Sequence, residues 1–221
     1  MQRSDEKIQQ DIREQWAFNS RVDASALEVE VVHGRVTLSG TVPSYPALEA
    51  AEKDARIMPG VRSVENRITV HPPTEEVTLP TDDEIRADVE RMLLRAPDVD
   101  IADLSVSVND GEVTLQGAVD QLWKKFRAQE IAGIIAGVRS IDNRLAVTPT
   151  ESVLDRVIGE GIESALQRMD TVAAEPIDVE VKDGVVRLAG EVPNHQSLQE
   201  AQEVARHCKG VVEVYNELQV S

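Results

Sequence analysis

The chain is poor in the residues on which most covalent and metal chemistry depends. It has one cysteine, four histidines and only 3% aromatic side chains among its 221 residues. The single cysteine, Cys208, excludes an intrachain disulfide framework. Because aromatic residues are so few, any core must be built from Val, Ile, Leu and Ala, and the hydrophobic content of 41% is sufficient for that.

Long apolar runs are also missing. No stretch approaches the roughly 20 apolar residues that a membrane-spanning helix needs. The amino-terminal sequence MQRSDEKIQQDIREQW lacks the apolar stretch of a secretory signal. We therefore expect a soluble chain that is cytoplasmic as given, or periplasmic if an export signal has been removed from it.

Positive charge is scarce as well. Lys and Arg number 23 against 40 Asp and Glu, which gives a formal net charge of −17. A field of this sign repels nucleic acid and anionic lipid at long range. Nucleic acid is therefore a poor candidate partner, and the plainest interpretation of the acidity is solubility.

The chain does contain one motif written three times. The motif reads VEVVHGRVTLSG from Val29, VSVNDGEVTLQG from Val106 and VEVKDGVVRLAG from Val179. Three glycines and one asparagine keep step in every copy: Gly34, Gly40, Gly60 and Asn66, then Gly111, Gly117, Gly137 and Asn143, then Gly184, Gly190, Gly210 and Asn216. Such self-similarity indicates one supersecondary unit used three times. We predict domains over residues 1–72, 81–148 and 149–221, with a proline-rich linker at 73–80.

Each copy predicts the same order of elements. Ile8, Ile12 and Trp16 are spaced four apart and share one face of a helix. Two stretches of alternating apolar residues follow and predict strands that meet at a turn such as Asp110-Gly111. An alanine-rich second helix and a third strand complete the copy. The predicted fold class is α+β, with three tandem αββαβ domains, each a three-stranded mixed sheet covered on one face by two helices.

The residues in register have structural interpretations. His33, which replaces the turn aspartate of the other copies, is expected to adopt positive φ. Gly40 and its equivalents are expected to let the second helix approach the sheet, and Gly60 and its equivalents to end that helix as C′ residues. Asn66 and its equivalents are expected to cap backbone groups at the third strand, although a ligand role shared by the three asparagines is the alternative.

Together, these motifs resemble a known family. The run V-x-V-x-(D/N)-G-x-V-x-L-x-G-x-V, an alanine-rich helix and the run G-V-x-x-(V/I)-x-N-x-L-x-V resemble the BON domain, which is named after bacterial osmotically inducible and nodulation proteins. The resemblance covers nearly the whole chain, three times. It implies an αββαβ fold, no enzymatic activity, and a link to osmotic and envelope stress and to the binding of phospholipid or other envelope surfaces. One type of relative senses potassium.

Catalytic and metal-binding patterns are not found in the sequence. The four histidines have no ligand spacing with one another or with Cys208, and there is no glycine-rich phosphate loop. Asp98, Asp100 and Asp103 miss the calcium-loop pattern and indicate a solvated loop. We therefore predict no enzyme, no catalytic residue, no metal and no cofactor.

One segment differs from its equivalents in the other two copies. The WKKFR segment, residues 123–127, consists of Trp123, Lys124, Lys125, Phe126 and Arg127. The other copies carry polar or loop residues where it has its two aromatics. In one interpretation it is a contact patch for a membrane interface or a partner protein. In the other, the aromatics pack against a neighbouring domain and the cations pair with that domain's acids.

Two functions are consistent with these features. The first is a non-enzymatic binding or scaffold protein related to osmotic or envelope stress, which contacts a phospholipid membrane or an envelope partner through the WKKFR segment. The second is a sensor of a small ligand or an ion such as potassium, whose domains rearrange on binding. The short connection between the second and third domains predicts that these two pack together, while the first moves separately.

Overall fold

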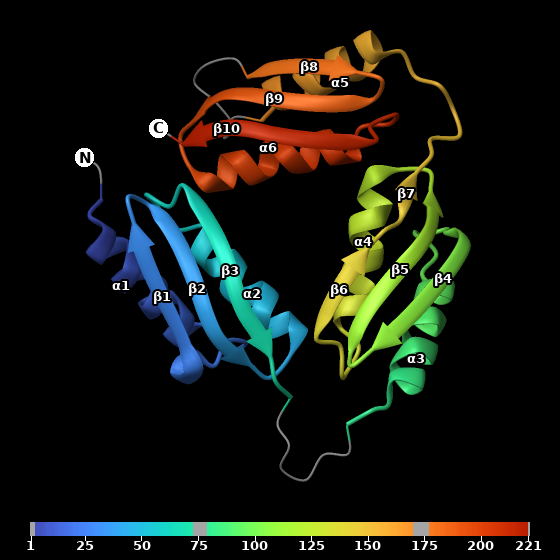
Figure 1. The fold of residues 1–221 in the computed structure, drawn as a ribbon. Coiled ribbons are helices and arrows are strands. Elements are labelled where there is room, and N and C mark those ends of the chain that lie inside the picture. Colours follow the sequence, from blue (N-terminus) through green and yellow to red (C-terminus); the bar gives the residue numbers. More distant parts are fainter. Residues whose placement is uncertain (1–2, 73–78, 170–176, 221) are drawn as a thin grey trace. The chain divides into compact units, whose positions relative to one another are not determined.

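A computed structural model describes residues 3–72, 79–169 and 177–220 of the chain (Figure 1). Most of the linker predicted at 73–80 lies outside the described residues. The chain divides into two compact units. Unit 1 holds residues 1–97, 105–115 and 128–144, and unit 2 holds residues 98–104, 116–127 and 145–221. The division passes through the middle repeat, so helix α4 contributes residues to both units.

All three repeats have the predicted order of elements (Figure 1). The first contains α1 (Asp5–Phe18), a short 3-10 turn η1 (Ala24–Ala26), β1 (Leu27–Val32), β2 (Arg35–Val42), α2 (Tyr45–Arg56) and β3 (Ser63–Val70). The middle one contains α3 (Asp82–Arg95), β4 (Ala102–Asn109), β5 (Glu112–Val119), α4 (Leu122–Gly133) and a third strand in two pieces, β6 (Ser140–Asn143) and β7 (Ala146–Val147). The last contains α5 (Asp155–Gln167), β8 (Asp178–Lys182), β9 (Val185–Val192), α6 (His195–His207) and β10 (Glu213–Val220).

The third strand of each repeat pairs with the second, which the sequence left open. In the first repeat β1 runs antiparallel to β2, and β3 runs parallel to β2 with Leu38 beside Asn66. The last repeat has the same mixed arrangement in the order β10-β9-β8. The predicted α+β class and the αββαβ repeats are thereby confirmed.

The first helix of each repeat buries its apolar stripe on the sheet. Ile8, Ile12 and Trp16 are each no more than 1% exposed, and the Trp16 indole donates a hydrogen bond to the carbonyl of Ala51 on α2. A capping box formed by Thr81 and Glu84 starts α3.

An aspartate at the start of each first helix holds the hairpin turn of its own repeat. The Asp5 carboxylate accepts hydrogen bonds from the backbone N–H groups of His33 and Gly34. Asp82 and Asp155 hold their turns in the same way, through residues Asp110 and Gly111, and Asp183 and Gly184. The turn residues preceding the glycines, His33 among them, have φ between 48° and 53°, so the turn role predicted for His33 is confirmed.

The reasons expected for two sets of glycines were wrong in detail. Gly40 has φ of 112°, and a Cβ there would lie 2.0 Å from the carbonyl oxygen of Ala26. The neighbour that requires glycine is thus the backbone entering β1, not the second helix. Gly60 is left-handed, with φ of 93°, but it follows the end of α2 at Arg56 by four residues and lies in the turn closed from Val61 N–H to Met58 C=O. It is a turn residue, not the C′ residue of α2.

Two of the three asparagines, Asn66 and Asn216, accept backbone hydrogen bonds within the third strand, as predicted. Asn66 accepts a hydrogen bond from the N–H of Ile68 through Oδ1, at 2.9 Å, and donates one from Nδ2 to Glu52 on α2, at 2.8 Å. Asn216 accepts from Leu218 in the same way. These side chains therefore satisfy backbone groups of the third strand and tie that strand to the second helix.

Candidate functional site

Metal-ligating clusters and reactive thiols are the first features that would mark a chemical site among the described residues. Within residues 3–72, 79–169 and 177–220, no three His, Cys, Asp or Glu side chains come together in a way that could hold a metal ion. Cys208 is half-buried, and burial raises the pKa of its thiol, which disfavours the reactive thiolate. Among these same residues, no helix combines the length and the apolar character required to cross a bilayer.

The WKKFR segment opens α4 and meets α6, all within unit 2. The Trp123 ring lies parallel to the imidazole of His207, with ring centroids 5.8 Å apart and planes inclined by 8°. The Trp123 indole donates a hydrogen bond to Oε1 of Gln121 at 2.9 Å. The ammonium of Lys124 lies 5.9 Å from the same ring, which is within cation–π range.

The second aromatic of the segment packs into the third repeat. Phe126 contacts the apolar core that α5, α6 and the sheet of that repeat enclose, next to Leu122, which is 5% exposed. The guanidinium carbon of Arg206 on α6 lies 3.9 Å from the centroid of the Phe126 ring. Phe126 is therefore covered on one face by a cation and packed on apolar side chains elsewhere.

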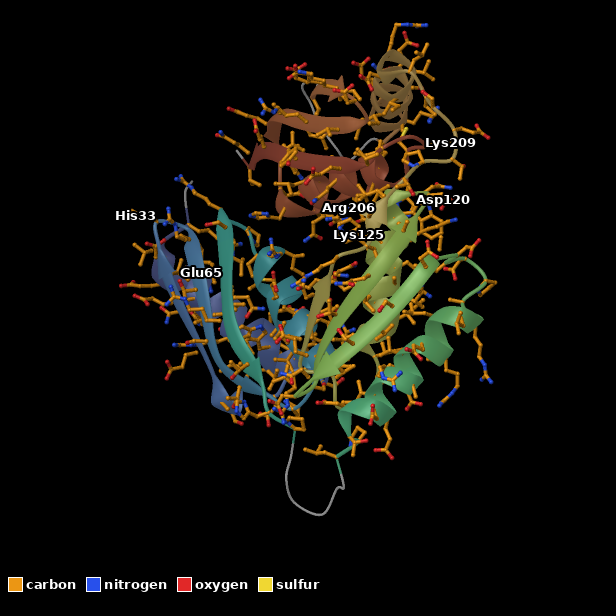
Figure 2. All side chains as sticks on the ribbon, turned by 45° about the vertical axis from the view of Figure 1, so that its right-hand side comes forward. His33, Glu65, Asp120, Lys125, Arg206 and Lys209 are labelled. Carbon is orange, nitrogen blue, oxygen red and sulfur yellow. The ribbon has the colours of Figure 1, made fainter. Side chains whose placement is uncertain are left out.

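The cations around this contact have acidic partners. Lys124 forms an ion pair with Asp120 at 2.6 Å, and this partner holds the pKa of the Asp120 carboxyl below its usual range. Arg127 lies 3.3 Å from Asp98, and Arg206 lies 2.7 Å from Glu203. Figure 2 labels Asp120, Lys125 and Arg206 where α4 and α6 meet. In this structure, neighbouring carboxylates thus compensate the positive charge of Lys124, Arg127 and Arg206.

These contacts bear on the two interpretations of the WKKFR segment. Trp123 and Phe126 contact His207 and Arg206, as packing against a neighbouring domain requires. The acidic partner of Lys124, Asp120, lies in the same repeat as Lys124, and so does Asp98, whose carboxylate lies 3.3 Å from Arg127.

A second contact between repeats, which the sequence did not predict, lies inside unit 1. The ring of Tyr45, at the start of α2, lies against Gly133 and Gln129 on α4, and its hydroxyl accepts a hydrogen bond from Nε2 of Gln129 at 3.3 Å. Burial, with the charge of Glu49, raises the pKa of Tyr45 to about 12. The first repeat therefore contacts the middle one through Tyr45, whereas the sequence predicted that the first repeat moves separately. The sequence feature that could have predicted this contact is Gly133, because the other copies have Arg56 and Arg206 at the equivalent positions.

Comparison with known families matches this architecture three times. The model of the BON domain matches residues 4–72, 81–149 and 155–221. The chain belongs to the BON domain family. Each match contains one complete αββαβ repeat, and the matched BON domains together account for almost all of the chain.

Individual BON-domain relatives are moderately similar. The chain is 29% identical over 143 residues to the osmotically-inducible protein Y of Escherichia coli (strain K12), covering 62% of this chain and 71% of that protein. It is 31% identical over 109 residues to the outer membrane lipoprotein DolP of Haemophilus influenzae, covering 49% of this chain and 56% of that protein. Among solved structures, CdsD of the type III secretion system of Chlamydia trachomatis aligns over 96% of this chain and 91% of that chain, at 12% identity and a TM-score of 0.28.

Proposed function

We propose that this chain is a non-enzymatic binding protein of osmotic or envelope stress, and that it contacts a phospholipid membrane through the WKKFR segment. The observation that carries the proposal is that three BON domains make up nearly the whole chain, and only the middle one has an aromatic and basic start to its second helix. The relatives named for osmotic induction and for the outer membrane support the setting.

The segment has the composition of a membrane contact. Trp and Phe favour the interface between water and hydrocarbon, and Lys and Arg are drawn to anionic headgroups. Lys124, Lys125 and Arg127 provide three cations in a chain of net charge −17. Because repulsion by the rest of the chain opposes binding, we expect reversible attachment that weakens as salt rises, with no stable residence on the membrane.

Co-sedimentation with vesicles tests the proposal. Wild-type protein is mixed with vesicles of phosphatidylglycerol and phosphatidylcholine, and with vesicles of phosphatidylcholine alone. We expect binding to the first only, and its loss in the variant Trp123→Ala with Phe126→Ala. The matched control is Pro46→Ala with Glu49→Ala, the equivalent positions of the first repeat. Absence of binding to every lipid mixture would remove the membrane proposal and leave a protein partner as the remaining candidate.

The cellular compartment is part of the same proposal. We expect the cytoplasm for the chain as given, and the periplasm if a signal precedes it in the native gene. Fractionation of cells that express the full native gene distinguishes the two, because only the periplasmic form is released when the outer membrane is selectively opened.

A further inference from the structure

The aromatic anchors of the proposed membrane contact are covered in this structure. One face of Trp123 is stacked on His207, and Arg206 lies over the ring of Phe126. Both covering side chains belong to the last turn of α6 in the third repeat. A bilayer would need the same ring faces, so α6 and a membrane cannot occupy them together.

Phe126 also packs on the apolar core of the third repeat, but the contacts that cover the two ring faces are individually weak in water. A stacked ring pair and a cation over a ring each contribute little to the free energy of the contact between α4 and α6, and an ion pair at the surface contributes still less. The His207 side chain is 59% exposed, and the Arg206 side chain is 21% exposed. The cover therefore lies at the solvent boundary, where a competing surface can replace it.

An anionic bilayer can replace the contacts that α6 makes with the two rings, and it can also bind the cations of the WKKFR segment. Its interface accepts the rings of Trp123 and Phe126, and its phosphates accept the cations that Asp120 and Asp98 now hold. Arg206, once released, adds a further cation to the exposed surface. The competitor is thus defined by its chemistry, as an anionic phospholipid headgroup layer above hydrocarbon.

We propose that α6 masks the WKKFR segment and that an anionic phospholipid surface displaces α6 from it, so that membrane binding opens the contact between the second and third BON domains. This inference rests on the proposed function and adds its regulation. A binding site that is mostly closed has its apparent affinity reduced by the fraction that is open. Anything that loosens α6 therefore strengthens membrane binding without any change in the segment itself.

The test uses a change of charge that would otherwise weaken binding. The variant Arg206→Glu with His207→Ala removes a cation from the chain and adds an anion, so simple electrostatics predicts weaker binding to phosphatidylglycerol vesicles. Unmasking predicts the opposite, an affinity higher by roughly three- to tenfold, the change expected when one ring contact is lost from the closed state. The matched control, Arg56→Glu with Ile57→Ala, makes the same change of charge at the equivalent positions of α2 and should bind no better than wild type.

A second measurement reports the mask without lipid. Trp16 is 1% exposed, so acrylamide quenching of tryptophan emission follows Trp123. Without lipid, quenching should rise in the Arg206→Glu, His207→Ala variant, because the Trp123 ring is uncovered. On addition of phosphatidylglycerol vesicles it should fall, more strongly in that variant than in wild type, because the interface shields the ring from acrylamide. His207→Ala alone, which removes only an exposed ring, serves if the double variant loses its helical circular dichroism.

The outcomes separate the two proposals. Wild-type binding that is unchanged or weaker in the Arg206→Glu, His207→Ala variant, with unchanged quenching, overturns the mask and leaves the membrane function standing. Absence of binding by wild type and every variant overturns both. Stronger binding that Trp123→Ala with Phe126→Ala then abolishes supports both.

Discussion

The ring of Tyr45 fills the space that a side chain at Gly133 would need. A Cβ on Gly133 would lie 2.7 Å from Cδ1 and 2.8 Å from Cε1 of that ring, closer than such atoms approach in proteins. The equivalent residues, Arg56 and Arg206, carry long side chains. The glycine therefore forms a notch in α4 that accepts an aromatic ring from α2.

Replacing Gly133 with alanine should destabilise unit 1. At an ordinary helical glycine the change stabilises a protein by about 0.4–1 kcal/mol, because the unfolded chain loses freedom. At Gly133 the added methyl group collides with Tyr45, so we expect a net loss in the free energy of unfolding measured with urea. Gly161→Ala in α5 is the control, because its Cβ would meet only Cys208 Sγ, at 3.5 Å, and it should stabilise. In a Tyr45→Ala background, Gly133→Ala should become stabilising as well, and a persisting loss would contradict the notch.

Tyr45 should ionise late in an alkaline titration. Burial and the charge of Glu49 raise its pKa to about 12, because both disfavour the phenolate. Folding stability linked to this group is intact below the pKa of about 10 that tyrosine has when unfolded, and is lost as pH rises through the folded value. Absorbance near the phenolate band should show a transition close to pH 12 that is missing in Tyr45→Phe. If Tyr45→Phe instead lost a transition near pH 10, the ring of Tyr45 would be exposed.

The Asp5 contact with the hairpin turn should depend on pH. Backbone hydrogen bonds from His33 and Gly34 lower the pKa of Asp5, so its contribution to stability is present above the unfolded value and is lost as pH falls through the folded one. Asp5→Asn replaces one accepting oxygen with a donor and should destabilise the first repeat at pH 7. At pH 3 the difference from wild type should shrink. Glu6→Gln, which removes a carboxylate from the same helical turn, is the control, and an equal effect there would implicate the helix dipole instead.

Both the removal of the Asn66 amide and its replacement by a carboxylate should lower the free energy of unfolding. Asn66→Ala leaves the N–H of Ile68 without its side-chain acceptor and should cost about 1–3 kcal/mol of unfolding free energy. Asn66→Asp places a carboxylate beside Glu52 and should cost more than alanine at pH 7 but less near pH 4. Asn143→Asp is the matched comparison, because the partner there is the neutral Gln129, at 3.4 Å, and the extra penalty should be absent. A ligand role for the asparagines would instead leave stability unchanged.

The elements were readable from the sequence because each copy repeats the same local signals. Apolar spacing of four located the stripe of Ile8, Ile12 and Trp16, and Asp-Gly pairs located two of the turns. Comparison among the copies also separated His33 from functional candidates. The pairing of β3 with β2 could not be read, because alternation gives the buried face of a strand but not its neighbour.

Contacts between repeats were harder to predict, because they depend on residues that break the repeat. Trp123 and Phe126 stood out as aromatics in an aromatic-poor chain, but their partners Arg206 and His207 looked like ordinary helix-end residues. Gly133 is not among the glycines that the copies share, so the repeat pattern gives it no structural role. The reason for Gly40 was mistaken because the backbone that approaches it, at Ala26, has no sequence signature.

The aspartates at the start of each first helix also have an evolutionary consequence. The carboxylates of Asp5, Asp82 and Asp155 each accept a hydrogen bond from a turn 28 residues downstream, and each of these contacts lies within one repeat. Because this contact lies within one repeat, a repeat can be duplicated, deleted or moved by unequal crossover without removing a hydrogen-bond partner from a neighbouring repeat. Substitutions at single helix positions, such as 123, 126 and 133, can then change which repeats pack against one another.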